Sequence, residues 1–126
     1  MRSVTLIILA LAMAGSTAAN AQAPAAVVVH LSNFKFSPPT IVMDHGKSYV
    51  LRLVNDGGSG HSFSAKSFFA AAQMKDRAAV SGGKVELPGD AVREVELVAP
   101  VAGTYEVKCT HFLHSSFGMT GSIVVR

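Results

Sequence analysis

The feature that most limits how this chain can fold is a series of short apolar segments interrupted by turn-forming residues. In one segment Tyr49, Leu51 and Leu53 alternate with side chains of the opposite face, and the glycine-rich turn 56–60 follows it. Period-two alternation in β-branched and aromatic runs bounded by Gly, Pro, Asp or Asn predicts strands. The expected strands are residues 27–31, 40–43, 48–55, 61–64, 92–98, 104–109 and 121–125, with another short one at 84–87.

One segment has helical spacing instead. Residues 65–74 are rich in Ala and Phe, and Phe68, Phe69, Ala72 and Met74 can form one apolar side of a short packing helix. Many short strands with little helix predict an all-β fold, an antiparallel sandwich or barrel.

The first 21 residues have the layout of a secretory signal peptide. A basic start at Arg2 precedes an apolar run, Val4–Ala14, that is too short to span a bilayer, and Ala19 to Ala21 form a small-residue cleavage site. We expect cleavage after Ala21, with cleavage after Ala23 as the alternative. The mature chain is then a single periplasmic domain, residues 22–126, without a membrane span.

The charge of the mature chain is mild. Without Arg2 it carries ten basic and eight acidic residues, a net charge of +2 with His neutral. The basic residues do not cluster, so nucleic acid is not an expected partner. A monomer is the simplest expectation for the oligomeric state.

The chain has a single cysteine, Cys109, in the segment CTHFLHSSFGM. An exported cysteine without a partner is exposed to oxidation unless it is buried or bound. Tyr105, Val107 and Cys109 share one face of the expected strand, whereas Glu106 and Lys108 share the other. The thiol therefore points toward the core at the end of the strand.

The loop after Cys109 supplies more metal ligands. His114 and Met119 follow with the spacing C-x4-H-x4-M and can fold back toward the sulfur. A thiolate, two imidazoles and a weak axial thioether are the ligands of a blue-copper centre. The second imidazole must come from a neighbouring strand, and His61, which opens the segment His-Ser-Phe after the glycine-rich turn, is the best candidate.

These residues give the chain a specific resemblance to the cupredoxin family of blue type 1 copper proteins, which includes plastocyanin and azurin. The GHSF segment and the loop resemble those of rusticyanin most closely. The resemblance covers nearly the whole mature chain and rests on residues 34–41 (FKFSPPTI), 46–55 (GKSYVLRLVN), 60–63 (GHSF), 102–109 (AGTYEVKC) and the loop through Gly118-Met119.

The resemblance implies a Greek-key β-sandwich that carries single electrons by Cu(I)/Cu(II) cycling and transforms no substrate. Electrons would leave through the exposed edge of His114, and the expected partners are redox proteins such as a cytochrome c or a copper-containing reductase or oxidase. The backbone N–H of Ser62, where many relatives have Asn, would bond the cysteine sulfur. The implied copper ligands are His61, Cys109, His114 and Met119.

Three alternatives stay open at this stage. His111 either points to solvent or competes for the metal and gives a Cys/His set suited to zinc. The protein could also be a copper carrier, storage protein or sensor without an electron-transfer role. Phe112, Leu113 and Phe117 either form an apolar patch around His114 or only pack the loop. An enzyme is not expected, since copper oxidases need further copper centres and a hydrolase would need Cys109 exposed.

Overall fold

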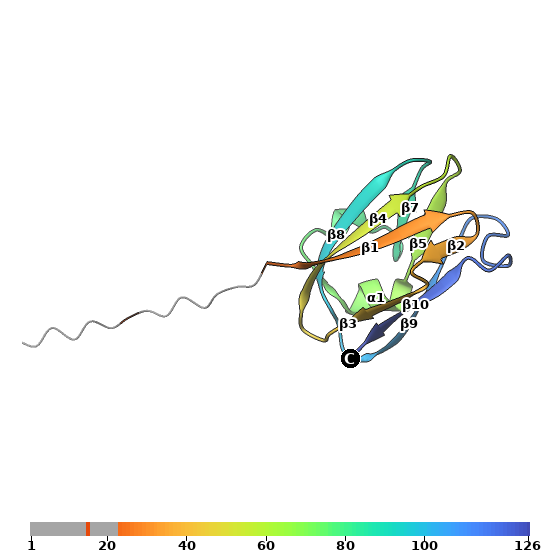
Figure 1. Ribbon diagram of the computed structural model, residues 1–126. Coiled ribbons are helices and arrows are strands. Elements are labelled where there is room, and N and C mark those ends of the chain that lie inside the picture. The colour runs from red at the N-terminus through yellow and green to blue at the C-terminus, as the bar shows by residue number, and fades with distance from the viewer. Residues whose placement is uncertain (1–14, 16–22) are drawn as a thin grey trace, which may run out of the picture.

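Two five-stranded sheets pack face to face in the computed structural model, which describes Gly15 and residues 23–126. The signal peptide expected over residues 1–21 therefore lies outside the described residues, Gly15 apart. Figure 1 shows the two layers, with the loop 109–119 at the end of the sandwich opposite the start of β1. The first sheet has the order β2 (Lys35–Ser37), β1 (Ala25–Ser32), β4 (Ser48–Asn55), β8 (Val92–Val98) and β6 (Gln73–Met74). The second has the order β3 (Thr40–Met43), β10 (Thr120–Val125), β9 (Gly103–Lys108), β5 (His61–Ser64) and β7 (Lys84–Leu87).

The sandwich confirms the predicted all-β class, but the sheets are mixed rather than purely antiparallel. Strand β1 runs parallel to β4, with Val29 beside Leu53, and β3 runs parallel to β10, with Ile41 beside Ile123. The reason is the path of the chain. Strand β3 follows β1 and precedes β4 in the sequence, but it belongs to the second sheet, whereas β1 and β4 belong to the first. A chain that crosses to the other sheet and then returns can form a strand parallel to the one it left. The alternation of residues along a single strand does not reveal such a crossing.

The core lies between the sheets and follows the predicted alternation. In β4 the side chains of Tyr49, Leu51 and Leu53 are buried, and Ile123 and Val125 of β10 are buried from the other layer. Complete burial of such a side chain contributes about 1.5–3 kcal/mol. The inward face of each strand therefore fixes its register, since a slip by one residue would turn these side chains to solvent.

The predicted helix over residues 65–74 is shorter in the structure. Helix α1 spans Lys66–Ala71, and it buries Phe68 and Phe69 as expected. Ala72 takes an extended conformation, and residues 73–74 instead form β6, where Met74 pairs with Leu97 of β8. Backbone pairing with β8 thus overrides the helical spacing of Met74. No helix in the described part of the chain is long and apolar enough to cross a membrane.

One buried amide ties together the segments that lead into the first predicted ligand. The Asn55 side-chain nitrogen donates to the carbonyl oxygens of Ser59 (2.8 Å), Leu87 (3.1 Å) and Pro88 (3.1 Å), and its oxygen accepts from the Gly57 N–H (3.0 Å). Strand β4, the turn before β5 and the end of β7 are thereby held at one pole. The strand β5 that begins at this pole carries His61.

Candidate metal centre

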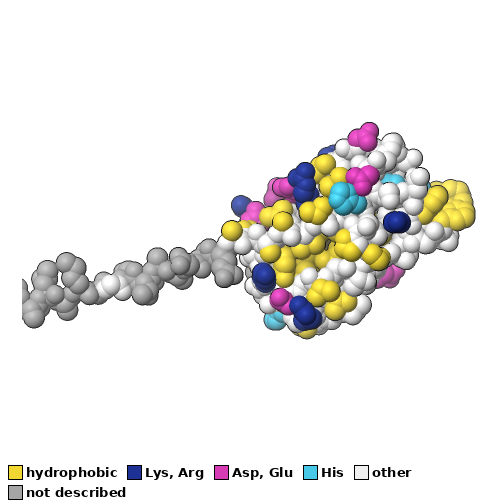
Figure 2. All heavy atoms as spheres, viewed as in Figure 1, with side chains coloured by type: hydrophobic (Ala, Val, Ile, Leu, Met, Phe, Trp, Pro, Cys, Tyr) yellow, Lys and Arg dark blue, Asp and Glu magenta, His cyan; other side chains and the backbone are white. Residues whose placement is uncertain are grey.

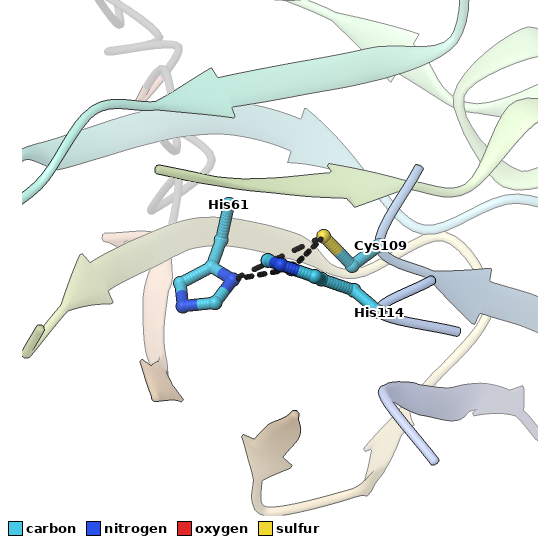
Figure 3. Close-up of side chains that lie close together, drawn as sticks. All are labelled: His61, Cys109 and His114. Atoms are coloured by element: carbon cyan, nitrogen blue, oxygen red, sulfur yellow. Dashed lines mark hydrogen bonds between the residues drawn. The ribbon is translucent and has the colours of Figure 1, made fainter. Parts of the chain in front are cut away.

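A thiol and two imidazoles converge at this pole (Figure 3). The Nδ1 atoms of His61 and His114 lie 3.2 Å apart, and the Cys109 sulfur lies 3.4 Å from the His114 Nδ1 and 4.0 Å from the His61 Nδ1. Together they form the only group of three or more His, Cys, Asp or Glu side chains within the described ranges that has its ligand atoms this close. The structure thus brings together three of the four predicted ligands.

His61 is positioned by the pairing of β5 with β7, where it lies opposite Leu87. Its side chain is 2% exposed, and the Nε2 atom is buried without a hydrogen-bond partner among the described residues. The pKa of His61 is lowered by burial and, to a smaller extent, by the neighbouring imidazoles of His114 and His111. The neutral ring that results has a free nitrogen lone pair, which is the form that binds a metal.

Cys109 directly follows β9, and it is fully buried, as the strand parity predicted. Its backbone N–H donates to the Met119 carbonyl (3.1 Å), which closes the loop at its base. The Ser62 N–H donates to the Cys109 sulfur over 3.4 Å, in agreement with the bond expected from the resemblance. A backbone donor at this distance stabilises a thiolate, because it is aimed at the negative charge.

The loop between Cys109 and β10 folds back through a series of tight turns. The Met119 N–H donates to the His114 carbonyl (3.0 Å), and the Met119 side chain is fully buried. Leu113 and Gly118 have positive φ angles of 63° and 95°, which allow the chain to reverse on either side of His114. Met119 is therefore tied by its backbone to both loop residues of the cluster.

The His114 ring is half-buried between two other rings. Phe34, in the turn between β1 and β2, meets it edge-on with a centroid distance of 5.2 Å, and His111 stacks on it at 5.6 Å and 29°. These contacts hold the imidazole with its Nδ1 toward the sulfur. Phe34 was not singled out from the sequence, because its contact with His114 joins segments far apart in the chain.

His111 does not join the cluster. Its Nε2 lies 2.9 Å from the Glu86 carboxylate of β7, and its side chain is partly exposed. Burial alone would raise the pKa of Glu86, but the hydrogen bonds from His111 and Lys84 outweigh that effect and lower it. An ionised Glu86 therefore holds His111 at the shoulder of the loop. Of the two interpretations of His111, the geometry favours the one in which it is no ligand.

A hydroxyl pair next to the sulfur was missed by the sequence analysis. The Ser62 and Thr110 hydroxyl oxygens lie 2.8 Å apart, and the Thr110 N–H donates to the Ser62 oxygen, also over 2.8 Å. Lys84 of β7 donates to the Thr110 hydroxyl over 3.4 Å. The sequence offered one indication of these neighbours. The alternation in residues 84–87 places Lys84 and Glu86 on the same face of that strand.

Apolar side chains surround the half-buried His114 on the molecular surface. Figure 2 shows hydrophobic side chains gathered at the end of the molecule where Figure 1 places the loop 109–119. Phe112 is 87% exposed and Phe117 is 63% exposed. With Phe34 and Leu113, also exposed, they form what we term the apolar pole. Of the two interpretations of these loop side chains, the exposure favours a surface patch over simple packing.

The cluster has the separations that one ion requires. A first-row ion such as zinc binds imidazole nitrogen at about 2.0–2.1 Å and thiolate sulfur at about 2.3 Å, so ligands of the same ion lie about 3–4 Å apart. The three separations here, 3.2, 3.4 and 4.0 Å, fall in that range. The soft thiolate and thioether with two imidazoles are the donors that favour copper. The residues present therefore fit a copper ion.

Comparison with known proteins agrees with this site. The family model of the cupredoxin-like domain matches residues 4–125. Similar solved structures are a dithionite-reduced auracyanin from Roseiflexus castenholzii (17% identity, TM-score 0.63), auracyanin B (20%, 0.62), and auracyanin A, a "blue" copper protein from Chloroflexus aurantiacus (20%, 0.61). In that order the matches cover 83%, 83% and 82% of this chain and 99%, 91% and 100% of theirs. No curated protein sequence matches the chain.

At these identities the solved structures establish the fold alone, and closeness to rusticyanin stays a prediction. The family model, however, spans nearly the whole chain, and the cluster supplies the donors that a type 1 copper ion needs. The cofactor is accordingly one type 1 copper ion, and the chain belongs to the cupredoxin-like family.

Proposed function

We propose that the protein is a periplasmic electron carrier whose single copper ion is held by four ligands, His61, Cys109, His114 and Met119. The observation that carries this proposal is the convergence of one thiol and two imidazole nitrogens, which come from β5, the end of β9 and the loop 109–119. When bound, copper supplies one-electron chemistry between Cu(I) and Cu(II).

The protein's own residues keep the ligands in place while the charge of the site changes. His61 is fixed by β5, and Cys109 and Met119 are joined through their backbones at the base of the loop. Ligands held by a packed scaffold move little between two oxidation states, which keeps the cost of reorganisation low. The cysteine sulfur is fully buried, so water and oxidants are kept from it.

The apolar pole supports transfer to another protein rather than conversion of a small substrate. His114 is the only one of the three clustered residues that is not fully buried, and its ring meets Phe34, which in turn packs against Phe117. Its ring edge gives an electron the shortest route between the site and the surface. The partners proposed are redox proteins such as a cytochrome c or a copper-containing reductase or oxidase, which bind a monomer through this apolar surface.

Two features support a periplasmic location. The sequence of residues 1–21 has the layout of a signal peptide. The lone thiol of Cys109 is fully buried, as a free cysteine in an oxidising compartment needs to be. Cleavage after Ala21 would leave residues 22–126, which include every residue of the site.

The test is the visible spectrum of the mature protein after addition of Cu(II), recorded for wild type and for Cys109→Ala. We expect an intense blue or green charge-transfer band that ascorbate bleaches and that the variant lacks, because the band requires thiolate bound to copper. His111→Ala should keep the band, since His111 lies outside the cluster, and His45→Ala, in an exposed turn, is the matched control.

Two other results would contradict the proposal. A protein that binds copper without the thiolate band would indicate a carrier, storage or sensor role. Loss of the band in His111→Ala, with copper still bound, would show that the ligands are wrongly assigned. Reversible one-electron oxidation and reduction in voltammetry separates an electron carrier from a protein that only stores copper.

A further inference from the structure

A line of hydrogen bonds runs from the surface to the cysteine sulfur. Lys84 Nζ donates to Thr110 Oγ1 over 3.4 Å, Thr110 Oγ1 lies 2.8 Å from Ser62 Oγ, and Ser62 Oγ lies 3.9 Å from the Cys109 sulfur. Four residues from β7, β5 and the segment after β9 therefore connect a solvent-exposed ammonium group to the buried thiol. Ser62 is fully buried.

The hydrogen bond between the Thr110 and Ser62 hydroxyls can run in either direction, and its direction decides whether the sulfur receives a second hydrogen bond. Each hydroxyl has one proton, and the Ser62 oxygen already accepts from the Thr110 N–H over 2.8 Å. If the Ser62 proton points to Thr110, the sulfur keeps only the Ser62 backbone donor. If the Thr110 proton points to Ser62, the Ser62 proton is free for the sulfur.

Lys84 favours the second arrangement. A hydroxyl that accepts a hydrogen bond from a cation becomes a stronger donor, because successive hydrogen bonds polarise one another. The ammonium group has three protons, so it can serve Thr110 and the Glu86 carboxylate, 3.1 Å away, at the same time. The bond to Glu86 also holds Lys84 beside Thr110.

We infer that Lys84 is a positioning residue for the copper site: it orients the Thr110 and Ser62 hydroxyls so that Ser62 donates its proton to the Cys109 sulfur. We term the four residues the lysine relay: Lys84, Thr110, Ser62 and Cys109. The inference rests on the proposed function, since its effect is on a thiolate bound to copper.

The relay has a defined consequence for the redox equilibrium. A hydrogen bond to the thiolate withdraws electron density from the sulfur and weakens its donation to Cu(II), so it favours the reduced state. Removal of the relay should therefore lower the reduction potential and strengthen the copper–sulfur bond. A charge acting only through space changes the potential as well, but leaves the sulfur's hydrogen bonds unaltered.

The experiment is a cycle of Lys84→Met and Thr110→Val in the copper-loaded protein, with the potential measured by voltammetry and the copper–sulfur stretch by resonance Raman spectroscopy. In Thr110→Val the Ser62 proton keeps the sulfur as its remaining acceptor whether or not Lys84 is present. We therefore expect Lys84→Met to lower the potential and raise the stretching frequency in the wild-type background, and to leave the stretch unchanged in the Thr110→Val background.

Two control variants distinguish the effect of the relay from the effect of losing a positive charge and from a general disturbance of the fold. Lys108→Met removes an exposed lysine next to Cys109 that makes no side-chain hydrogen bond within the part of the chain that the structure describes, and it should leave the stretch unchanged. Lys84→Arg keeps a cationic donor and should restore both readouts toward wild type.

If Lys84→Met changed the potential and the stretching frequency equally in both backgrounds, the relay would be overturned. The effect of Lys84 would then come from its charge acting through space. An unchanged stretch in the wild-type background would overturn it as well. A wild-type protein without a blue band would instead overturn the proposed function and the relay together, so the two failures are distinguishable.

Discussion

The Nδ1 atoms of His61 and His114 lie 3.2 Å apart, although 53 residues separate them in the chain. The two rings differ in exposure, because His61, at the start of β5, is buried, whereas His114 is half-buried and lies next to Phe34 of the apolar pole. The same ligand type is thus presented once from the interior of the sandwich and once from its surface. This difference can be tested chemically.

Substitution of either histidine by glycine should abolish the blue band, but external imidazole should restore it only in His114→Gly. The cavity left by His114 opens toward solvent, so a free imidazole can enter it, whereas the space left by His61 is closed by the surrounding strands. The measurement is the charge-transfer absorbance during an imidazole titration. Equal restoration in the two variants would contradict the assigned exposure.

The metal-free protein should lose stability as the pH falls below about 6.5, the ordinary pKa of histidine. Burial, His114 and His111 lower the pKa of native His61, so the unfolded chain takes up a proton at a higher pH than the native one does. The free energy of unfolding is therefore highest above the ordinary pKa and decreases toward the lowered one. Glu86, whose native pKa is also lowered, adds a second loss below its ordinary value of 4.5.

Urea titrations of the apoprotein between about pH 8 and about pH 5 measure this dependence. His61→Gln should flatten it in the upper part of the range. His45→Gln, in an exposed turn without contacts to the cluster, is the control and should keep the wild-type slope. A steep slope that persists in His61→Gln would assign the proton uptake to another group.

Asn55→Ala should lower the free energy of unfolding by about 1–3 kcal/mol. The substitution removes three donations to backbone carbonyls and leaves the Gly57 N–H without its acceptor. Chemical denaturation measures the loss, and Asn33→Ala, at an exposed position, should stay within about 0.5 kcal/mol of wild type. Equal stability of the two variants would show that the Asn55 amide does not hold this pole together.

Phe112→Ser should slow electron self-exchange without altering the blue band or the stability by more than about 0.5 kcal/mol. The ring is 87% exposed, so it does not contribute to core packing, and it belongs to the loop that carries His114. Val101→Ser provides the matched control, because Val101 is 64% exposed in the turn before β9, at the opposite end of that strand from Cys109. A similar loss of rate in both variants would argue against the apolar pole as the route of transfer.

Much of the fold and the cluster was predictable because both follow local rules. The alternation around Tyr49 and Leu51 indicated which faces are buried, and the parity of residues 104–109 correctly placed the Cys109 thiol in the interior. The separation of His114 and Met119 from Cys109 identified the loop. His61 followed because copper needs a second imidazole and a strand begins at that residue.

What the sequence did not reveal depends on contacts between distant segments. Glu86 lies 25 residues from His111 in the chain, and Lys84 lies 26 residues from Thr110. No periodicity within β7 indicates that its outward face meets the loop, because this depends on which strands neighbour β5. The parallel pairing of β1 with β4 was missed for the same reason, since the crossing of β3 to the other sheet is a property of the whole sandwich.

The position of the cluster in the chain also links the metal site to the last strand of the second sheet. Cys109, His114 and Met119 come just before β10, the last strand, which lies between β3 and β9. Until that strand is in place the loop has no second anchor, so the ligands meet only in a nearly finished sandwich. Binding of one ion by all of these residues is therefore coupled to completion of the sandwich. The blue colour would therefore report that β10 has completed the second sheet.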